Sequence, residues 1–437
     1  MSLKLQKLWL LGLLLAGLSS ATVRYDGYRV YSVTPANAVQ LKELQMLDGV
    51  FDSIIFPHGI DGIDEKTNVV VAPHKVADFV QIMTDMAIKY ELLSTNLQTK
   101  LQTNKEGSRS RSYASNKRND KNNYSENSTP FDYDWNNYYS LETTHGFLKK
   151  LSQRFRLESD YYNVGPKANG SEMWVFEVKS NSGMDVDETP SIFIEAGIYG
   201  NEWIAPATAT YIIKSLLTTE DLEIKNIVDK YNWYIMPFAN PDGYKYSFTT
   251  DPLWRKNRSK HSKFCRGVDL NRNFKYHWNY DKSAHNPCSN IYSGPAAESE
   301  QETQVLTKFV KRISNLKLYI SLQGYSQKLV YPYHVVMEYF QKEIDVKQVL
   351  AVSLDALKHR YGTNYTGGNM PYTMAGSSLD WAAATQTANM AFTYKLRPST
   401  GSINNAIRRV SITQILPTAV ETFDSLIAMA RKVLILS

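Results

Sequence analysis

The stretch FIEAGIYGNEWIAPATA runs from Phe193 to Ala209 and joins a short apolar run to a long helical one. The run SIFIEA at its start is typical of a buried strand, and WIAPATATYIIKSLL is typical of a helix. The same alternation recurs along residues 131–437. Its other strand runs are YNWYIMPF, LKLYISL and MAFTYKL, and its other helical stretches are ESEQETQVLTKFVKRI and TAVETFDSLIAMARKVLIL. Strands that alternate with helices predict one α/β domain whose sheet is covered on both faces.

Residues 22–102 are predicted to form a smaller unit. The runs YRVYSV, ANAVQLKELQML, DSIIF, TNVVVA and KVADFVQIMTDMAIKY indicate the order strand, helix, strand, strand, helix. The apolar side chains at helical spacing are Val39, Leu41, Leu44 and Leu47 in the first helix, and Val76, Phe79, Met83 and Ile88 in the second. This order predicts a small open α/β sandwich.

The first 20 residues have the pattern of a secretory signal peptide. Lys4 and Lys7 precede and flank the apolar run LWLLGLLLAGL, and the small residues Ser19, Ser20 and Ala21 follow it. The run is shorter than the roughly 20 residues that cross a bilayer, which disfavours a membrane anchor. We therefore predict a secreted, extracellular protein. A net charge of +6 over 437 residues is modest and gives no reason to expect a nucleic-acid or membrane partner.

Residues 103–130 separate the two units with the segment TNKEGSRSRSYASNKRNDKNNYSENSTP. This polar, basic composition buries too little apolar surface to order itself. Arg109, Arg111 and the pair Lys117–Arg118 would make the segment a target for a trypsin-like or dibasic-cleaving protease. A plain flexible linker is the alternative.

The chain has two cysteines, Cys265 and Cys288. In the oxidising compartment that a signal peptide implies, we expect them to pair, and two free thiols are the alternative. The loop so closed would contribute roughly 3 kcal/mol to stability on the loop-entropy estimate.

Five triplets fit the N-glycosylation pattern, at Asn123, Asn127, Asn169, Asn257 and Asn364.

Longer motifs occur in one order along the second unit: NEWIAPATA, NPDGY, LWRKNR, GVDLNRNF, YSGP, YSQKLVYPY, SLDWA and LPTAVET. Together they resemble the zinc carboxypeptidases of the pancreatic A/B type. The resemblance implies a mixed, twisted, eight-stranded sheet with helices on both faces, preceded by a propeptide domain and a cleavable linker. It also implies one zinc ion, held by an H-x-x-E pair and a distant histidine, with a glutamate as general base.

Three of the four positions that the resemblance assigns to metal and base carry other residues. The H-x-x-E motif reads YGNE, with Tyr199 in place of the histidine and Glu202 retained. Gln323 stands at the second histidine and Lys395 at the general base. A tyrosine hydroxyl with a pKa near 10 and a neutral amide are poor substitutes for imidazole. We therefore predict that the chain binds no zinc, with zinc expected only if the family's activity is retained.

The cation at Lys395 would lie beside the vacated metal position. A buried carboxylate without a partner is costly, so our hypothesis is an ion pair between Lys395 and Glu202. None of the eight histidines stands at a ligand position, which disfavours a substitute metal site.

The resemblance assigns roles in substrate binding to several retained residues. Arg255 matches the arginine that stabilises the oxyanion, and Asn271 with Arg272 match the pair that grips a C-terminal carboxylate. Tyr372 matches a mobile tyrosine, Tyr325 lines an outer subsite, and Leu379 makes the specificity pocket apolar. Two further arginines of the family are replaced by Asn201 and Pro252. A purely structural role for Asn271, Arg272 and Tyr372 is the alternative.

Three functions therefore remain open at this point. The first is a monomeric, inactive carboxypeptidase-like protein that still binds peptide or protein C-termini. The second is an active metallocarboxypeptidase that releases aliphatic or aromatic C-terminal residues. The third is a scaffold without a ligand. The residues at the site, and not the fold, favour the first.

Overall fold

The computed structural model describes residues 22–48, 53–57, 59–60, 62–101, 133–165, 171–278, 282–332, 343–369, 375–385, 388–397 and 410–436. The predicted signal peptide, the predicted linker, Tyr372 and the triplets at Asn123, Asn127 and Asn169 lie outside these residues. Among the helices described, none is both long and apolar enough to cross a membrane.

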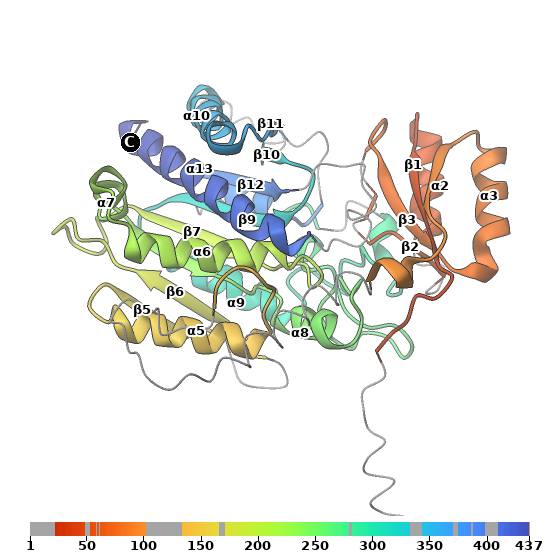
Figure 1. Ribbon diagram of the computed structural model, residues 1–437, viewed down its shortest axis with the longest axis horizontal. Coiled ribbons are helices and arrows are strands. Elements are labelled where there is room, and N and C mark those ends of the chain that lie inside the picture. The colour runs from red at the N-terminus through yellow and green to blue at the C-terminus, as the bar shows by residue number, and fades with distance from the viewer. Residues whose placement is uncertain are drawn as a thin grey trace, which may run out of the picture.

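An eight-stranded mixed sheet forms the centre of the larger domain, in the order β11-β10-β12-β9-β7-β8-β6-β5 (Figure 1). Its strands are β5 (Ser159–Asn163), β6 (Trp174–Val178), β7 (Ser191–Ala196), β8 (Asn232–Met236), β9 (Leu316–Gly324), β10 (Lys328–Tyr331), β11 (Thr366–Asn369) and β12 (Met390–Leu396). The adjacent strands β12, β9, β7 and β8 run parallel. Their carboxyl ends therefore meet at one edge of the sheet, which is the edge where open α/β folds bind ligands.

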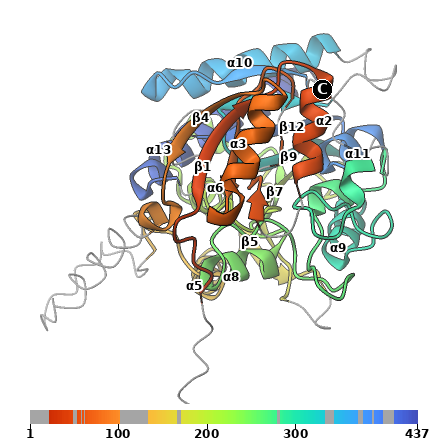
Figure 2. The ribbon, with the colours of Figure 1, turned by 90° about the vertical axis from the view of Figure 1, so that its right-hand side faces the viewer.

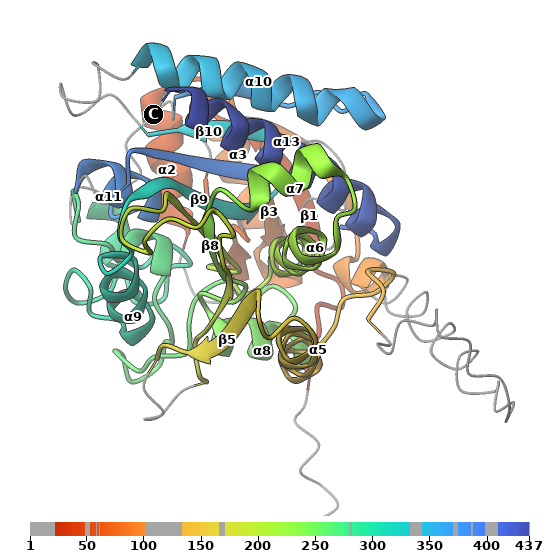
Figure 3. The same cartoon turned by 90° about the vertical axis from the view of Figure 1, so that its left-hand side faces the viewer.

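Helices cover both faces of this sheet, as predicted (Figure 3). One face packs against α5 (Leu141–Arg154), α6 (Ile204–Thr218), α7 (Leu222–Val228), α10 (Glu343–Tyr361) and α13 (Ile415–Leu436). The other face packs against α9 (Gln301–Val310) and α11 (Ser378–Ala384). The helix α8 (Pro241–Thr249) follows β8 at the edge where the parallel strands end. Helix α6 is buried on most sides because it lies between the sheet and α13.

The N-terminal domain is the predicted open sandwich. Its antiparallel sheet has the order β2-β3-β1-β4 and is covered by two helices, with Leu44 and Phe79 in the shared core. The elements are β1 (Arg29–Thr34), α2 (Ala38–Leu47), β2 (Ile54–Ile55), β3 (Thr67–Val71), α3 (Val76–Asp85) and β4 (Lys89–Ser94).

Two details of this domain differ from the sequence prediction. The second helix was predicted to run through Tyr90 but ends at Asp85, because Ala87 adopts a left-handed φ of 51° and β4 begins at Lys89. Val39 was grouped with the apolar side chains at helical spacing in the first helix, yet it is 68% exposed. Five residues separate it from Leu44, which puts it about 140° further round the helix.

The N-terminal domain packs over the edge where the parallel strands end (Figure 2). The Val23 N–H donates to the Thr250 carbonyl at 2.9 Å, and the Tyr25 hydroxyl donates to Asp251 at 2.8 Å. On the opposite side of the contact, Lys328 forms an ion pair with Glu65 at 3.0 Å.

In the larger domain, the predicted disulfide between Cys265 and Cys288 is present.

Of the two described glycosylation triplets, we expect only Asn364 to carry a glycan when the chain is made in a secretory pathway. Asn364 is exposed in the turn before β11. Asn257 is 1% exposed, and its Nδ2 donates to Glu300 and Glu302 at 2.7 and 3.1 Å, so a glycan there is incompatible with folding. Glycopeptide mass spectrometry of the folded, secreted protein measures both sites, with Asn364→Gln as control. Occupancy at Asn257 would contradict this placement.

Candidate active-site cleft

The positions predicted to carry the chemistry meet at the carboxyl edge of β7, β9 and β12. Tyr199 and Glu202 lie in the turn after β7, Gln323 is next to the last residue of β9, and Lys395 is next to the last residue of β12. In the parallel pairing of β9 with β12, Lys395 is opposite Gln323, so both side chains project from the same face. The fold thus brings these distant residues together, as the motifs predicted.

Tyr199 is buried and held from two sides. Its hydroxyl accepts a hydrogen bond from Asn271 Nδ2 at 2.8 Å, and the Arg255 guanidinium lies 3.6 Å from the centre of its ring. Burial raises the pKa of Tyr199 above its usual value, although Arg255 and the Asn271 hydrogen bond act in the lowering direction. The phenol is therefore neutral at physiological pH, and a neutral phenol is a poor metal ligand.

The other two ligand positions are also engaged with the protein itself. Gln323 is buried, and its Nε2 donates to the Ser321 hydroxyl at 3.0 Å. Glu202 is buried, and its Oε2 accepts a hydrogen bond from the backbone N–H of Gly324 at the end of β9. The carboxylate thus bridges the turn after β7 and the end of β9.

A buried carboxyl group, Glu195 of β7, lies beneath these residues. It accepts hydrogen bonds from the Tyr319 hydroxyl at 2.8 Å and the Ser378 hydroxyl at 2.7 Å, and it also hydrogen-bonds Ser321. Burial raises its pKa, and these hydroxyl groups partly offset the shift. Sequence reasoning missed this residue. Its signal was a lone acid in the otherwise apolar run SIFIEA.

These contacts link two of the replaced positions into one chain of hydrogen bonds. The Ser378 N–H donates to Asn271 Oδ1 at 2.9 Å, while Asn271 Nδ2 donates to Tyr199. The chain therefore runs in the order Tyr199, Asn271, Ser378, Glu195, Ser321 and Gln323. Asn271 consequently uses both its oxygen and its nitrogen within the protein.

Lys395 is partly exposed at the end of β12, and Lys328 of β10 is opposite it on its second side. The ion pair of Lys328 with Glu65 of the N-terminal domain directs that neighbouring charge away toward the domain contact. The ion pair proposed between Lys395 and Glu202 stays a prediction.

Beside Tyr199, three cationic side chains gather around two carboxylates. Arg255 donates to Asp269 Oδ2 at 3.0 and 3.2 Å, and Arg272 Nε lies 3.8 Å from the same oxygen. Lys256 donates to the carbonyls of Pro287 and Ser289. Each of these cations was part of a motif read from the sequence, and Asp269 lies in the motif GVDLNRNF.

The second carboxylate is Asp48, which the N-terminal domain contributes at the end of α2. It is buried and accepts a hydrogen bond from the Ser289 hydroxyl at 2.7 Å. Burial raises the pKa of Asp48 to about 6, while Ser289, Lys256, Arg255 and Arg272 act against that shift. Sequence reasoning missed Asp48 because nothing in its neighbourhood shows which surface it meets.

The remaining predicted residues occupy buried places near the cleft. Leu379 lies in α11 and packs in the core on the α9 side of the sheet, and Tyr325 is buried directly after β9. Asn201, at a lost arginine position, donates to the Leu253 carbonyl at 3.2 Å.

Comparison with known proteins identifies the two domains. Residues 144–425 match the zinc carboxypeptidase family and residues 31–104 match the carboxypeptidase activation peptide. The chain belongs to the zinc carboxypeptidase family. It is 40% identical to zinc carboxypeptidase A 1 of Drosophila melanogaster over 96% of this chain and 94% of that protein. The relative of the same name in Anopheles gambiae is 36% identical, over 94% and 90%.

The fold matches solved carboxypeptidases over nearly the whole chain. Carboxypeptidase A from Helicoverpa armigera superposes with a TM-score of 0.78 at 24% identity, covering 94% of this chain and 98% of that one. At this identity the comparison establishes the common fold.

The side chains at these positions do not fit the zinc ion that the family name implies. Within the described ranges, no three His, Cys, Asp or Glu side chains are arranged to hold a metal. Tyr199 is a neutral phenol bonded to Asn271, Gln323 is an amide bonded to Ser321, and Glu202 accepts from the Gly324 backbone. A catalytic zinc site needs three strong ligands, and one carboxylate remains.

The raised pKa of Asp48 predicts a pH-dependent stability. The folded state holds the Asp48 proton more tightly than the unfolded chain, so stability rises as the pH falls through about 6. Relative to Asp48→Asn, the unfolding free energy of the wild type should gain about 2 kcal/mol between about pH 7 and about pH 4. Denaturant titrations across that range measure it. A difference between the two proteins that does not change with pH would refute the assignment.

Proposed function

We propose that this chain is a secreted, carboxypeptidase-like protein that does not hydrolyse peptides and whose cleft binds the C-termini of peptides or proteins. The absence of peptide hydrolysis is inferred from the neutral, hydrogen-bonded phenol of Tyr199. At the family's first ligand position stands a neutral phenol, bonded to Asn271 and covered by the Arg255 guanidinium. A cation stacked on that ring adds electrostatic repulsion against a divalent metal.

Peptide hydrolysis at neutral pH needs an activated water and stabilisation of the oxyanion. In this family a zinc ion would activate the bound water, and a carboxylate would accept the proton of that water. Lys395 stands at the base position, where the side chain is an amine and not a carboxylate. Arg255, the oxyanion donor of the family, is instead stacked on Tyr199 and bonded to Asp269. None of the residues at these positions can activate the water, accept its proton or stabilise the oxyanion in place of the family's groups.

The cations beside the cleft support the binding part of the proposal. Arg255, Arg272 and Lys256 all act on the carboxylate of Asp48, so this group of charges is already complementary to one carboxylate. A peptide C-terminus offers the same chemistry to the Arg272 fork. Leu379, at the position that the family resemblance assigns to the specificity pocket, is apolar, which favours an aliphatic or aromatic terminal residue.

One observation favours a second candidate, a scaffold without a ligand. Both polar atoms of the Asn271 amide are engaged with Tyr199 and Ser378, so this residue would have to share or exchange a hydrogen bond to hold a peptide. Arg272 would then carry most of the carboxylate recognition.

Restoring the three replaced side chains should restore the metal site. The variant Tyr199→His/Gln323→His/Lys395→Glu is expected to bind about one zinc per chain and to release C-terminal phenylalanine from a blocked dipeptide after linker cleavage. The wild type should do neither. Zinc is measured by mass spectrometry after dialysis, and adding Glu202→Ala to the triple variant is the control that removes zinc again. Stoichiometric zinc with chelator-sensitive turnover in the wild type would overturn the proposal.

C-terminal binding has a separate test. Calorimetry on linker-cleaved protein should show binding of a peptide that ends in phenylalanine and at least a roughly tenfold weaker affinity for its C-terminal amide. Arg272→Gln should weaken the acid form and leave the amide unchanged. The wild-type full-length chain should bind more weakly than its Asp48→Asn variant, because Asp48 competes for the same cations. If neither acid nor amide binds, the chain is a scaffold.

A further inference from the structure

A second cavity lies on the α9 side of the larger domain, apart from the cleft. Its volume is about 580 Å³, within the range of small-molecule sites. Its walls come from the segment 257–261, the start of α9, Asp242 of α8, and the residues Gly165, Ser171 and Met173. Among the residues that line it, none is a ligand, base or carboxylate-binding position of the carboxypeptidase site.

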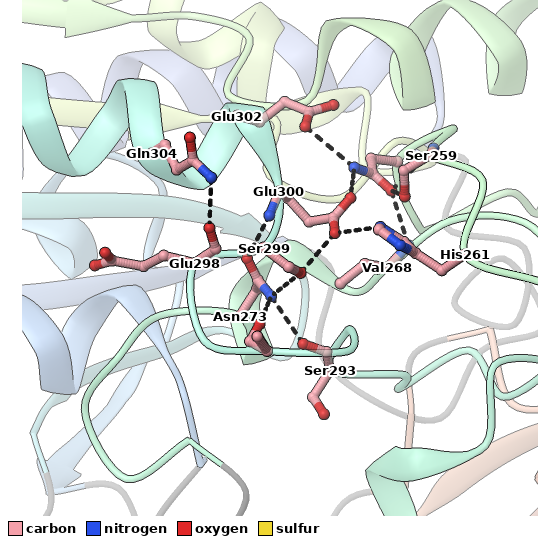
Figure 4. A network of polar contacts seen from close by, with 12 residues as sticks. Ser259, His261, Val268, Asn273, Ser293, Glu298, Ser299, Glu300, Glu302 and Gln304 are labelled. Carbon is pink, nitrogen blue, oxygen red and sulfur yellow. Dashed lines mark hydrogen bonds and ion pairs between the residues drawn. The ribbon is translucent and has the colours of Figure 1, made fainter.

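The lining of this cavity includes acidic side chains, and two of them, Glu300 and Glu302, share one amide donor (Figure 4). Glu300 accepts from His261 Nε2 and Ser299 Oγ, each at 2.7 Å, and from Asn257 Nδ2 at 2.7 Å. The same Asn257 nitrogen also serves Glu302, at 3.1 Å. One amide group therefore stands between two carboxyl groups.

A third acid, Asp242, accepts from the backbone and hydroxyl of Ser171 and adds its charge to the same wall. The pKa of Glu302 is raised to about 7, chiefly by burial and in smaller part by the charges of Glu300 and Asp242, while a backbone hydrogen bond and the one from Asn257 act in the lowering direction. Three acidic side chains therefore lie in the lining of this cavity.

A fixed cation faces the cavity from another side. The Arg258 guanidinium lies 3.6 Å from the ring centre of Tyr246 and 4.2 Å from that of Trp254. Stacking holds the plane of the group and leaves its N–H edge for acceptors. Within the described part of the chain, that edge donates no hydrogen bond to the protein. Lys260 is exposed in the same lining.

We propose that this cavity binds a small zwitterion of amino-acid to dipeptide size, with its ammonium at Glu300 and Glu302 and its carboxylate at Arg258. The two charged walls match the two charges of such a molecule, and Met173 and Val305 add apolar contact for a side chain. A bare metal ion is a poorer fit, because the acids among the described residues do not converge into a metal-binding group. An ammonium needs no such convergence, since its charge spreads over three donors.

The ligand is expected to change the protonation of its own site. An ammonium beside Glu302 stabilises the ionised carboxylate, so binding near pH 7 should release a fraction of a proton. The charged groups that act on Glu302 are Glu300 and Asp242, and both oppose its ionisation. Arg258, Lys260 and His261 line the same cavity. Affinity should accordingly fall as the pH is lowered below about 7.

Calorimetry on the full-length protein with glycyl-leucine tests the proposal. Binding is expected at millimolar or lower concentration, and at least about tenfold weaker for N-acetyl-glycyl-leucine and for glycyl-leucine amide, which each lack one charge. Repeating the titration in two buffers of different ionisation enthalpy should reveal proton release, and Glu302→Gln should abolish both the release and most of the affinity.

Glycyl-leucine could also bind in the carboxypeptidase cleft. A variant in each place distinguishes binding in the cleft from binding in the cavity. Arg272→Gln should leave glycyl-leucine binding in the cavity unchanged, whereas Arg258→Gln should weaken it. Thermal denaturation confirms that each variant is folded. The proposal is wrong if glycyl-leucine does not bind at about 10 mM, if the N-acetyl form binds equally well, or if Arg272→Gln and not Glu302→Gln removes the binding.

Discussion

The carboxyl group of Glu195 holds the floor of the cleft together. It is fully buried in β7 and joins three hydroxyl donors, Tyr319, Ser378 and Ser321. A buried carboxyl group is stable only when such donors surround it, so their positions are fixed with it. Through Ser378 the constraint reaches Asn271 and Tyr199, and through Ser321 it reaches Gln323. The side chains at two of the predicted ligand positions are therefore part of the buried hydrogen-bonded structure of this fold.

Much of this arrangement was predictable from sequence, because it depends on the positions of motifs. The alternation of strands and helices predicted the sheet, and parallel strands necessarily end at one edge, which brings Tyr199, Gln323 and Lys395 together. Hydrogen-bond partners were not predictable. Whether Asn271 faces a ligand or Tyr199 depends on distances between segments that meet only in the folded chain. The end of α3 was missed because Ile88, at helical spacing, fits equally well at the start of a strand.

The contact between the two domains gives the cleft a carboxylate of its own. Asp48 reaches the cations beside the cleft from α2, while Glu65 pairs with Lys328 at the other side. The burial that raises the pKa of Asp48 works against the attraction of Arg255, Arg272 and Lys256. Two opposing effects, burial and the attraction of these cations, therefore set the pKa of Asp48 at the domain contact. Under the proposed function, an external carboxylate would compete with Asp48 for the same cations.

Charge balance explains why the replaced residues occur together. The family pattern has two carboxylates at the centre, one as ligand and one as base, and a divalent zinc ion neutralises them. Here Glu202 keeps one negative charge and Lys395 contributes one positive charge, so the formal sum is again zero without a metal. Tyr199 and Gln323 add none, because both are neutral. A lone return to glutamate at position 395 would leave two carboxylates near one another in a buried cleft, which is costly. The predicted loss of the metal is therefore best explained by substitutions that are coupled through their charges.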